Sequence, residues 1–138
     1  MTTTGRVRHI LIAYDGGEPS QTALGVGIEL AGGSPATVGV VSVIRAGVGV
    51  PDDPWSETSE QAARLHDARR RIEEAGLKAE MHAPTGPPGP SIVEVATAFG
   101  YDTIVIGSRR LGPIRRTLLG SVSRYVASHS SATVVIAR

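Results

Sequence analysis

The chain of 138 residues contains no cysteine. Disulfides, thiol catalysis and cysteine-ligated metal sites are therefore excluded. No apolar run approaches the roughly 20 residues that span a bilayer, and the opening residues MTTTG lack the apolar core of a signal peptide. We therefore expect a soluble, cytoplasmic protein with no membrane partner. The net charge is only +1, which predicts no nucleic-acid partner.

The usual signs of catalysis are also missing. No G-x-G-x-x-G follows the first apolar run, which argues against a dinucleotide dehydrogenase. The four histidines are scattered without ligand-like spacing, and no acidic pair indicates a two-metal centre. We therefore assign no catalytic residue and no metal-binding residue, and we expect at most a slow hydrolytic activity.

Segments with strand-like and helix-like patterns alternate along the chain. The expected strands are His9–Tyr14, Thr37–Ile44, Leu77–Ala83, Thr103–Ile106 and Thr133–Ala137. The expected helices start at Pro19, near Ser56 or Thr58, at Pro90 and at Gly120. This alternation predicts an α/β fold, an open parallel five-stranded sheet with helices on both faces. We expect a single domain over residues 1–138, because this length suits one core.

The second expected helix carries signals at both ends. Thr58 and Gln61 have the spacing of a capping box at its start. Gly76 ends it, and Leu77 is placed to fold back in a Schellman-type contact. Arginines interleave with acidic residues between positions 64 and 74, which predicts a solvated face for this helix.

A strongly basic stretch runs from Gly107 to Arg124, GSRRLGPIRRTLLGSVSR, with five arginines and no acidic residue. We expect it to leave a strand as a loop and to enter a helix at Gly120–Ser123. Glycine lets a ligand approach the backbone, and a helix N-terminus favours an anion. Hydroxyl groups can donate to phosphate oxygens, and the local positive charge adds long-range attraction. The stretch therefore predicts a phosphate-binding site.

Two further residues, Asp15 and Val43, stand like Gly107 at the carboxyl ends of expected strands. In open parallel sheets, ligands bind beside these ends, where the direction of winding reverses. We therefore expect Asp15, Val43 and the basic stretch to contribute to one site.

Four segments together resemble the universal stress protein family along nearly the whole chain. They are Tyr14–Ser20 (YDGGEPS), Asp102–Arg109 (DTIVIGSR), Leu118–Ser123 (LLGSVS) and Ala132–Ile136 (ATVVI). The resemblance implies a Rossmann-like sheet of the adenine nucleotide α-hydrolase type, a stress-response regulatory role, and a homodimer through the last strand, residues 133–137. For one branch of the family it also implies bound ATP, with Mg²⁺ held through the phosphates.

That ATP-binding branch carries a Gly, two residues, a second Gly, nine residues, and then Gly-Ser or Gly-Thr. Gly107, Gly120 and Ser121 match at the right spacing, whereas Arg110 stands where the second Gly belongs. The resemblance implies that Asp15 accepts a hydrogen bond from adenine or ribose, and that the Val43 backbone contacts adenine. The site residues assigned in this way are Asp15, Val43, Gly107, Ser108, Arg109, Arg110, Gly120, Ser121, Val122 and Ser123.

Arg110 has two opposing effects on the expected site. Its side chain adds bulk where glycine is usual, but a guanidinium is also a strong bidentate partner for phosphate. We expect the side chain to swing outward, so that ATP binding is retained but weakened.

Alternatives stay open at this stage. A branch of the family binds no nucleotide, in which case the chain would be a dimeric scaffold. The segment DGGEPS weakly echoes the S-G-G-x-D-S pyrophosphate loop of adenylating enzymes, although Asp15 would repel a pyrophosphate there. For single residues, Asp15 could cap the first helix or close a turn, and Gly107 could simply end a strand. Gly120–Ser123 could form a plain N-cap cluster.

Overall fold

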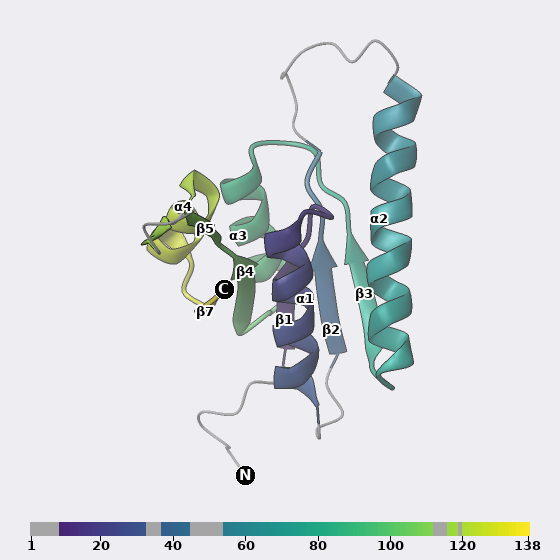
Figure 1. The fold of residues 1–138 in the computed structure, drawn as a ribbon, viewed down its shortest axis with the longest axis horizontal. Coiled ribbons are helices and arrows are strands. Elements are labelled where there is room, and N and C mark those ends of the chain that lie inside the picture. Colours follow the sequence, from purple (N-terminus) through teal and green to yellow (C-terminus); the bar gives the residue numbers. More distant parts are fainter. Residues whose placement is uncertain (1–8, 33–36, 45–53, 112–115, 119) are drawn as a thin grey trace.

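Strands and helices alternate along the chain in the computed structural model, which describes residues 9–32, 37–44, 54–111, 116–118 and 120–138 (Figure 1). The helices are α1 (Glu18–Ala31), α2 (Pro54–Glu74), α3 (Pro88–Ala98) and α4 (Ser121–His129). The strands are β1 (His9–Ala13), β2 (Thr37–Val41), β3 (Lys78–His82), β4 (Thr103–Gly107), β5 (Arg109–Leu111), β6 (Arg116–Leu118) and β7 (Thr133–Ala137).

Five of these strands form one parallel sheet in the order β3-β2-β1-β4-β7. This confirms the α/β fold and the parallel five-stranded sheet that the sequence predicts. Central β1 is apolar because both of its faces are covered, and its last four residues are buried. The chain winds from β1 towards β3 and then returns to add β4 and β7 on the other side. The reversal between β1 and β4 is where such sheets bind ligands.

Helices cover both faces of the sheet (Figure 1). On one face, Ile12 of β1 is buried with Leu24 of α1 and Ile72 of α2. On the other, Leu11 of β1 is buried in the core that includes Val126 of α4. Successive side chains of a strand point to opposite faces, so β1 contributes to both cores in turn. The alternation continues into the residue after β1, so Ala13 and Tyr14 face opposite sides of the sheet.

Two features were predicted for the ends of α2, a capping box at its start and a Schellman contact at its end, and only the second is present. The helix begins at Pro54, so Thr58 and Gln61 lie inside it and the predicted capping box is wrong. Buried Gln61 instead donates a hydrogen bond of 2.7 Å to the carbonyl of Ser42. At the other end the Schellman contact is confirmed. Gly76 has φ +80, and the N–H of Leu77 donates to a carbonyl in the last turn at 3.2 Å.

The sequence predicts that the basic stretch is a loop, but part of it forms strands. Arg109–Leu111 pairs antiparallel with Arg116–Leu118, forming a separate two-stranded sheet. Strands of three residues are too short to show an alternating pattern, so they could not be predicted from the sequence. The side chains of both strands, and residues 112–115 and 119, lie outside the described part of the structure.

Two other boundaries differ from expectation by more than one residue. The second strand ends at Val41 rather than Ile44, and the third helix begins at Pro88 rather than Pro90. Beyond Val41, the N–H of Ser42 still donates to the carbonyl of His82 at 3.0 Å, and an isolated bridge joins Ile44 to Thr85.

A close backbone contact fixes α1 against β4. A Cβ built on Gly107 would lie 2.1 Å from the carbonyl oxygen of Pro19, much closer than real atoms approach. Glycine at this position is therefore required by the packing of the first turn of α1 on the end of β4. The contact joins the loop after β1 to the start of the basic stretch.

We predict that Gly107→Ala lowers the free energy of unfolding by about 1–3 kcal/mol, the usual cost of overpacking. The carbonyl of Pro19 belongs to the backbone and cannot rotate aside as a side chain would. Gly25→Ala in α1 is the matched control, since its Cβ would meet nothing within 4 Å. That variant should gain about 0.5–1 kcal/mol from helix propensity. Urea unfolding measures both, and a Gly107→Ala protein as stable as the wild type would contradict the contact.

A polar network crosses the sheet on the α3 side, over β2. The hydroxyl of Tyr101 donates to Glu80 at 2.8 Å and lies 2.7 Å from Nε2 of His82. The ring of His82 also packs 4.5 Å from that of Phe99, measured between ring centroids. Gly39 makes room for the network, because its Cβ would fall 2.1 Å from the Tyr101 hydroxyl. Burial lowers the pKa of His82, outweighing the charge of Glu80, which raises it.

We predict a contribution of His82 to the pH dependence of stability. Because its folded-state pKa lies below the ordinary value of 6.5, protonation favours the unfolded chain. Stability from this residue is present above pH 6.5 and is lost as the pH falls through the lowered pKa. Thermal melts from pH 7.5 to 5.5 should show a smaller drop in Tm for His82→Gln than for the wild type. Equal drops would remove His82 as a cause.

Candidate functional site

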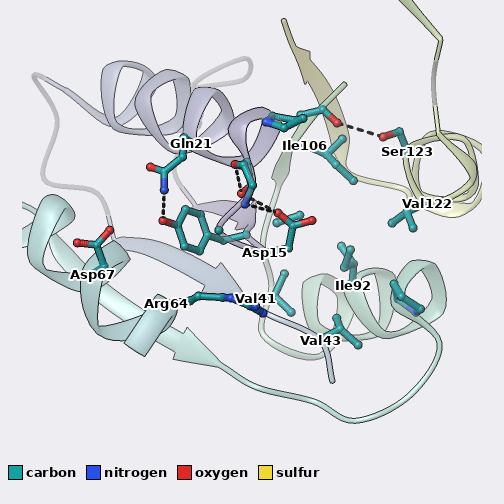
Figure 2. A pocket seen from close by; sticks show the side chains of 18 of the residues that line it. Asp15, Gln21, Val41, Val43, Arg64, Asp67, Ile92, Ile106, Val122 and Ser123 are labelled. Atoms are coloured by element: carbon teal, nitrogen blue, oxygen red, sulfur yellow. Dashed lines mark hydrogen bonds between the residues drawn. The ribbon is translucent and has the colours of Figure 1, made fainter. Parts of the chain in front are cut away.

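A cleft of about 940 Å³ opens at the carboxyl ends of the central strands (Figure 2). Its walls come from the loop after β1, the ends of β2 and β4, and helices α1 to α4. Asp15 and Gly107, at the ends of β1 and β4, both line it. The cleft therefore lies at the predicted reversal of winding, and its size suits a small-molecule ligand.

The cleft has two chemically different sides, separated by Asp15 (Figure 2). The apolar side lies towards α3 and α4, and it is lined by Ala13, Val41, Val43, Ile92, Ile106 and Val122. The polar side lies towards α1 and α2, and it is lined by Tyr14, Gln21, Arg64 and Asp67. The division follows from the strand alternation, since Ala13 belongs to one core and Tyr14 to the other.

Asp15 is exposed and takes part in the turn that leads into α1. Its Oδ1 accepts hydrogen bonds from the N–H of Gly17 at 2.8 Å and from the hydroxyl of Ser20 at 3.0 Å. Gly17 is the N-cap of α1, so Asp15 closes the turn and does not cap the helix. Both of these bonds use the same oxygen. A role in the turn is thus compatible with ligand binding through Oδ2.

The structure brings half of the sequence-predicted site residues to the cleft. Those lining it are Asp15, Val43, Gly107, Val122 and Ser123. The hydroxyl of Ser123 donates to the carbonyl of Gly107 at 3.4 Å, which ties the start of α4 to the end of β4. Gly107 lines the cleft, but the space where its side chain would be is filled by Pro19.

The other predicted residues lie beside the cleft and are not part of its described lining. Ser108 is buried, and its hydroxyl is an unpartnered polar group among the described residues. Gly120 is the N-cap of α4 with no side-chain cap, which argues against a plain N-cap cluster. A Cβ on Gly120 would meet nothing within 4 Å, so packing does not require glycine there. Ser121 follows it and is exposed.

The predicted contacts of the arginine side chains stay predictions. Arg109 and Arg110 lie in β5, but their side chains are outside the described part of the structure. The outward turn of the Arg110 side chain therefore stays a prediction.

Sequence reasoning missed the contribution of α2, whose arginines were assigned to a solvated face. The side chain of Arg64 passes over the loop after β1, with Cγ and Cδ 3.2 Å from where a Gly16 Cβ would be. Half-buried Arg71 donates to the side-chain oxygen of Gln21 in α1. Residues 64, 67 and 71 share one helical face by their spacing, and this was the available signal.

Tyr14 is the most deeply buried polar group on the polar side, with 3% of its surface exposed. Burial raises its pKa, and the nearby charge of Asp67 raises it further. The hydroxyl therefore stays protonated at neutral pH. It can act as a hydrogen-bond donor or acceptor there, but not as a base.

The described residues hold no group of three or more His, Cys, Asp or Glu side chains that could bind a metal ion. No helix in the described part of the chain is long and apolar enough to cross a membrane. Asp15 and Asp67 are the carboxylates of the described cleft lining. The arrangement supplies shape, hydrogen bonds and local charge, which are the elements of a binding site.

Comparison with known proteins identifies the family. The model of the "Universal stress protein family" matches residues 6–138. The chain is 30% identical to the universal stress protein YxiE of Bacillus subtilis, covering 94% of this chain and 97% of that one. It is 28% identical to the universal stress protein Rv2624c of Mycobacterium tuberculosis over 96% of this chain, although it spans only 48% of that relative.

Solved structures agree with these matches. A universal stress protein in complex with cAMP has a TM-score of 0.77 and 25% identity to this chain, covering 97% of this chain and 98% of its own. Because the family model covers nearly the whole sequence and the fold agrees, the chain belongs to the universal stress protein family.

Proposed function

We propose that this protein is a stress-response regulator that binds ATP or a related adenine nucleotide in the cleft, without robust catalysis. The observation that carries the proposal is the apolar side of the cleft, bounded by Asp15 at one end and the uncapped start of α4 at the other. A flat apolar base, a polar sugar and an anion need these three kinds of environment. A family relative solved with cAMP supports the same ligand class.

In this proposal the adenine lies among Val43, Ile92 and Val122, and the Val43 backbone offers it hydrogen bonds. Oδ2 of Asp15 accepts a hydrogen bond from adenine or ribose. The phosphates point towards Gly107 and the start of α4, because helix N-termini favour anions. The residues assigned to the phosphates are Gly107, Ser108, Arg109, Arg110, Gly120, Ser121, Val122 and Ser123.

Mg²⁺ would be bound through the phosphates in this scheme. The described residues offer no cluster that could hold the ion alone, and Mg²⁺ commonly combines few carboxylates with phosphate oxygens. A regulatory role, with hydrolysis slow or absent, accords with the family. That the protein is cytoplasmic and consists of one domain also stays a prediction.

Asp15→Ala should weaken ATP binding by about 1.5–3 kcal/mol, the range for a hydrogen bond to a charged group. Asp15→Asn is the matched control for the turn, because its amide oxygen still accepts from Gly17 and Ser20. Calorimetric titration gives the affinities, and thermal melts show how much stability the turn loses. An unchanged Kd in Asp15→Ala would remove this residue from the site. Failure of the wild type to bind ATP at millimolar concentration would leave the dimeric scaffold.

We further propose a homodimer that pairs through β7, residues 133–137. This strand lies at the edge of the sheet, and Val134, Val135 and Ile136 are only partly buried. An apolar edge strand offers unpaired backbone groups to a second chain, and a two-fold pair is the commonest closed assembly.

Val135→Pro should shift the protein towards monomer, because proline removes one backbone donor from the edge. Light scattering at micromolar concentration measures the mass of the wild type and the variant. Thr133→Ser, which keeps the backbone donor, is the control. A wild type of monomer mass, or a proline variant with unchanged assembly, would exclude this interface.

A further inference from the structure

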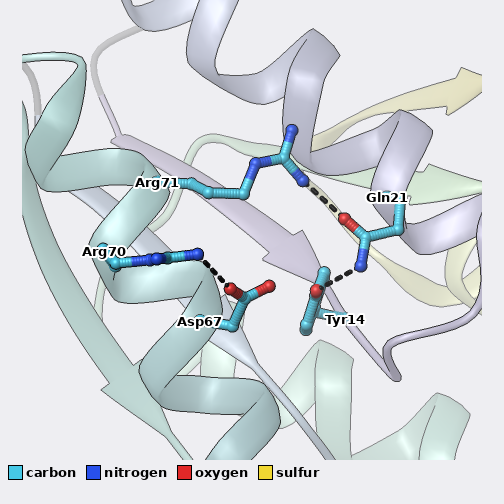
Figure 3. Close-up of polar contacts among 5 residues, drawn as sticks. All are labelled: Tyr14, Gln21, Asp67, Arg70 and Arg71. Atoms are coloured by element: carbon cyan, nitrogen blue, oxygen red, sulfur yellow. Dashed lines mark hydrogen bonds and ion pairs between the residues drawn. The ribbon is translucent and has the colours of Figure 1, made fainter.

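The polar side of the cleft contains an ordered chain of hydrogen bonds (Figure 3). Arg71 of α2 donates to Oε1 of Gln21 in α1, and Nε2 of Gln21 donates to the hydroxyl oxygen of Tyr14 at 2.6 Å. The chain links two helices and the end of β1. Its last member, Tyr14, is almost completely buried and lines the cleft.

Hydrogen-bond chemistry fixes the direction of this chain. A guanidinium has donors only, so Gln21 must present its carbonyl oxygen to Arg71 and its NH₂ group to Tyr14. The oxygen of Tyr14 therefore accepts, and its own hydrogen is directed elsewhere. Among the described residues, the hydroxyl hydrogen of Tyr14 makes no hydrogen bond, and the bond from Gln21 is one that its oxygen accepts. Tyr14 is thus a donor held in a set orientation beside the cleft.

Asp67 faces Tyr14 from α2 (Figure 3). One oxygen of Asp67 binds Arg70 at 2.9 Å, and the other lies on the side of Tyr14. The two side chains do not bond directly, yet the charge of Asp67 acts on the pKa of Tyr14. Both line the cleft, so a ligand group that reaches this part of it meets a donor from Tyr14 and an acceptor from Asp67.

Only some chemical groups can satisfy both of these partners. A hydroxyl fits, because it accepts from Tyr14 and donates to Asp67 at once. A phosphate or carbonyl oxygen would accept from Tyr14 but has no hydrogen to donate to Asp67. An ammonium group would pair with Asp67 but offer nothing to Tyr14. The pair is therefore complementary to an alcohol.

We propose that Tyr14 and Asp67 form a subsite for a sugar hydroxyl of the bound nucleotide, with Gln21 and Arg71 as positioning residues. This inference rests on the proposed function. With the base on the apolar side, the sugar is the next part of the ligand and lies beside Asp15, which separates the two sides. The subsite makes the protein select ribonucleotides over deoxyribonucleotides.

The test compares ATP, 2′-deoxy-ATP and 3′-deoxy-ATP by calorimetric titration on the full chain. The wild type should bind ATP roughly tenfold more tightly than one of the two deoxy analogues, since that analogue leaves Tyr14 and Asp67 unpaired. Tyr14→Phe keeps the buried ring and removes the donor, so this preference should fall to about one. Tyr125→Phe is the matched control. Tyr125 packs against Gly89 and His129, away from the cleft, and the preference should persist.

Gln21→Glu tests the direction of the chain without removing Tyr14. A carboxylate keeps its bond to Arg71 but can only accept from Tyr14, so the hydroxyl turns away from the ligand. The preference for ATP should be lost here too, with ordinary thermal stability. This variant serves as the test if Tyr14→Phe proves unstable.

The outcomes separate the two proposals. If the wild type binds ATP and both deoxy analogues with equal affinity, the hydroxyl subsite is overturned while the nucleotide site stands. The same holds if the preference for ATP survives in Tyr14→Phe and Gln21→Glu. Binding of a water molecule alone between Tyr14 and Asp67 would give the first of these results. No binding of any nucleotide to the wild type overturns both proposals.

Discussion

The parallel pairing of β1 with β2 on one side and β4 on the other is the constraint on which the cleft depends. This pairing brings together the carboxyl ends of strands that are separated by tens of residues in the sequence, and it buries both faces of β1. The residues that follow β1 must then leave the sheet in a tight turn, which Asp15 closes through Gly17 and Ser20. The close contact of Pro19 with Gly107 ties that turn to β4, so both walls of the cleft rest on one rigid framework.

Much of this arrangement could be predicted because it depends on local sequence patterns. Short β-branched runs gave the strands, glycines gave the ends of helices, and the rule for parallel sheets placed Asp15, Val43 and Gly107 at one edge. Positions within a strand or a helix turn depend mainly on neighbours in sequence. For the same reason the Schellman contact at Gly76 was predictable.

The parts that were missed depend on contacts between distant segments. Arg71 and Gln21 are separated by 50 positions, so no local pattern shows that they meet. Arg64 looks like one charge among several on a solvated helix until α2 is docked beside the loop after β1. The hairpin of β5 and β6 was missed for a different reason. It is defined by backbone pairing, and strands of three residues are too short to show an alternating sequence pattern.

The two edges of the sheet differ in chemistry, and this difference bears on how large an assembly can become. On β3, charged Lys78 and Glu80 are exposed, whereas β7 carries valine and isoleucine at the corresponding place in the sheet. Charged edge strands resist the addition of further strands. A sheet with two apolar edges could add copies at both ends and grow into a filament. A sheet with one can add a copy on one side only, so growth by this route stops after a single addition.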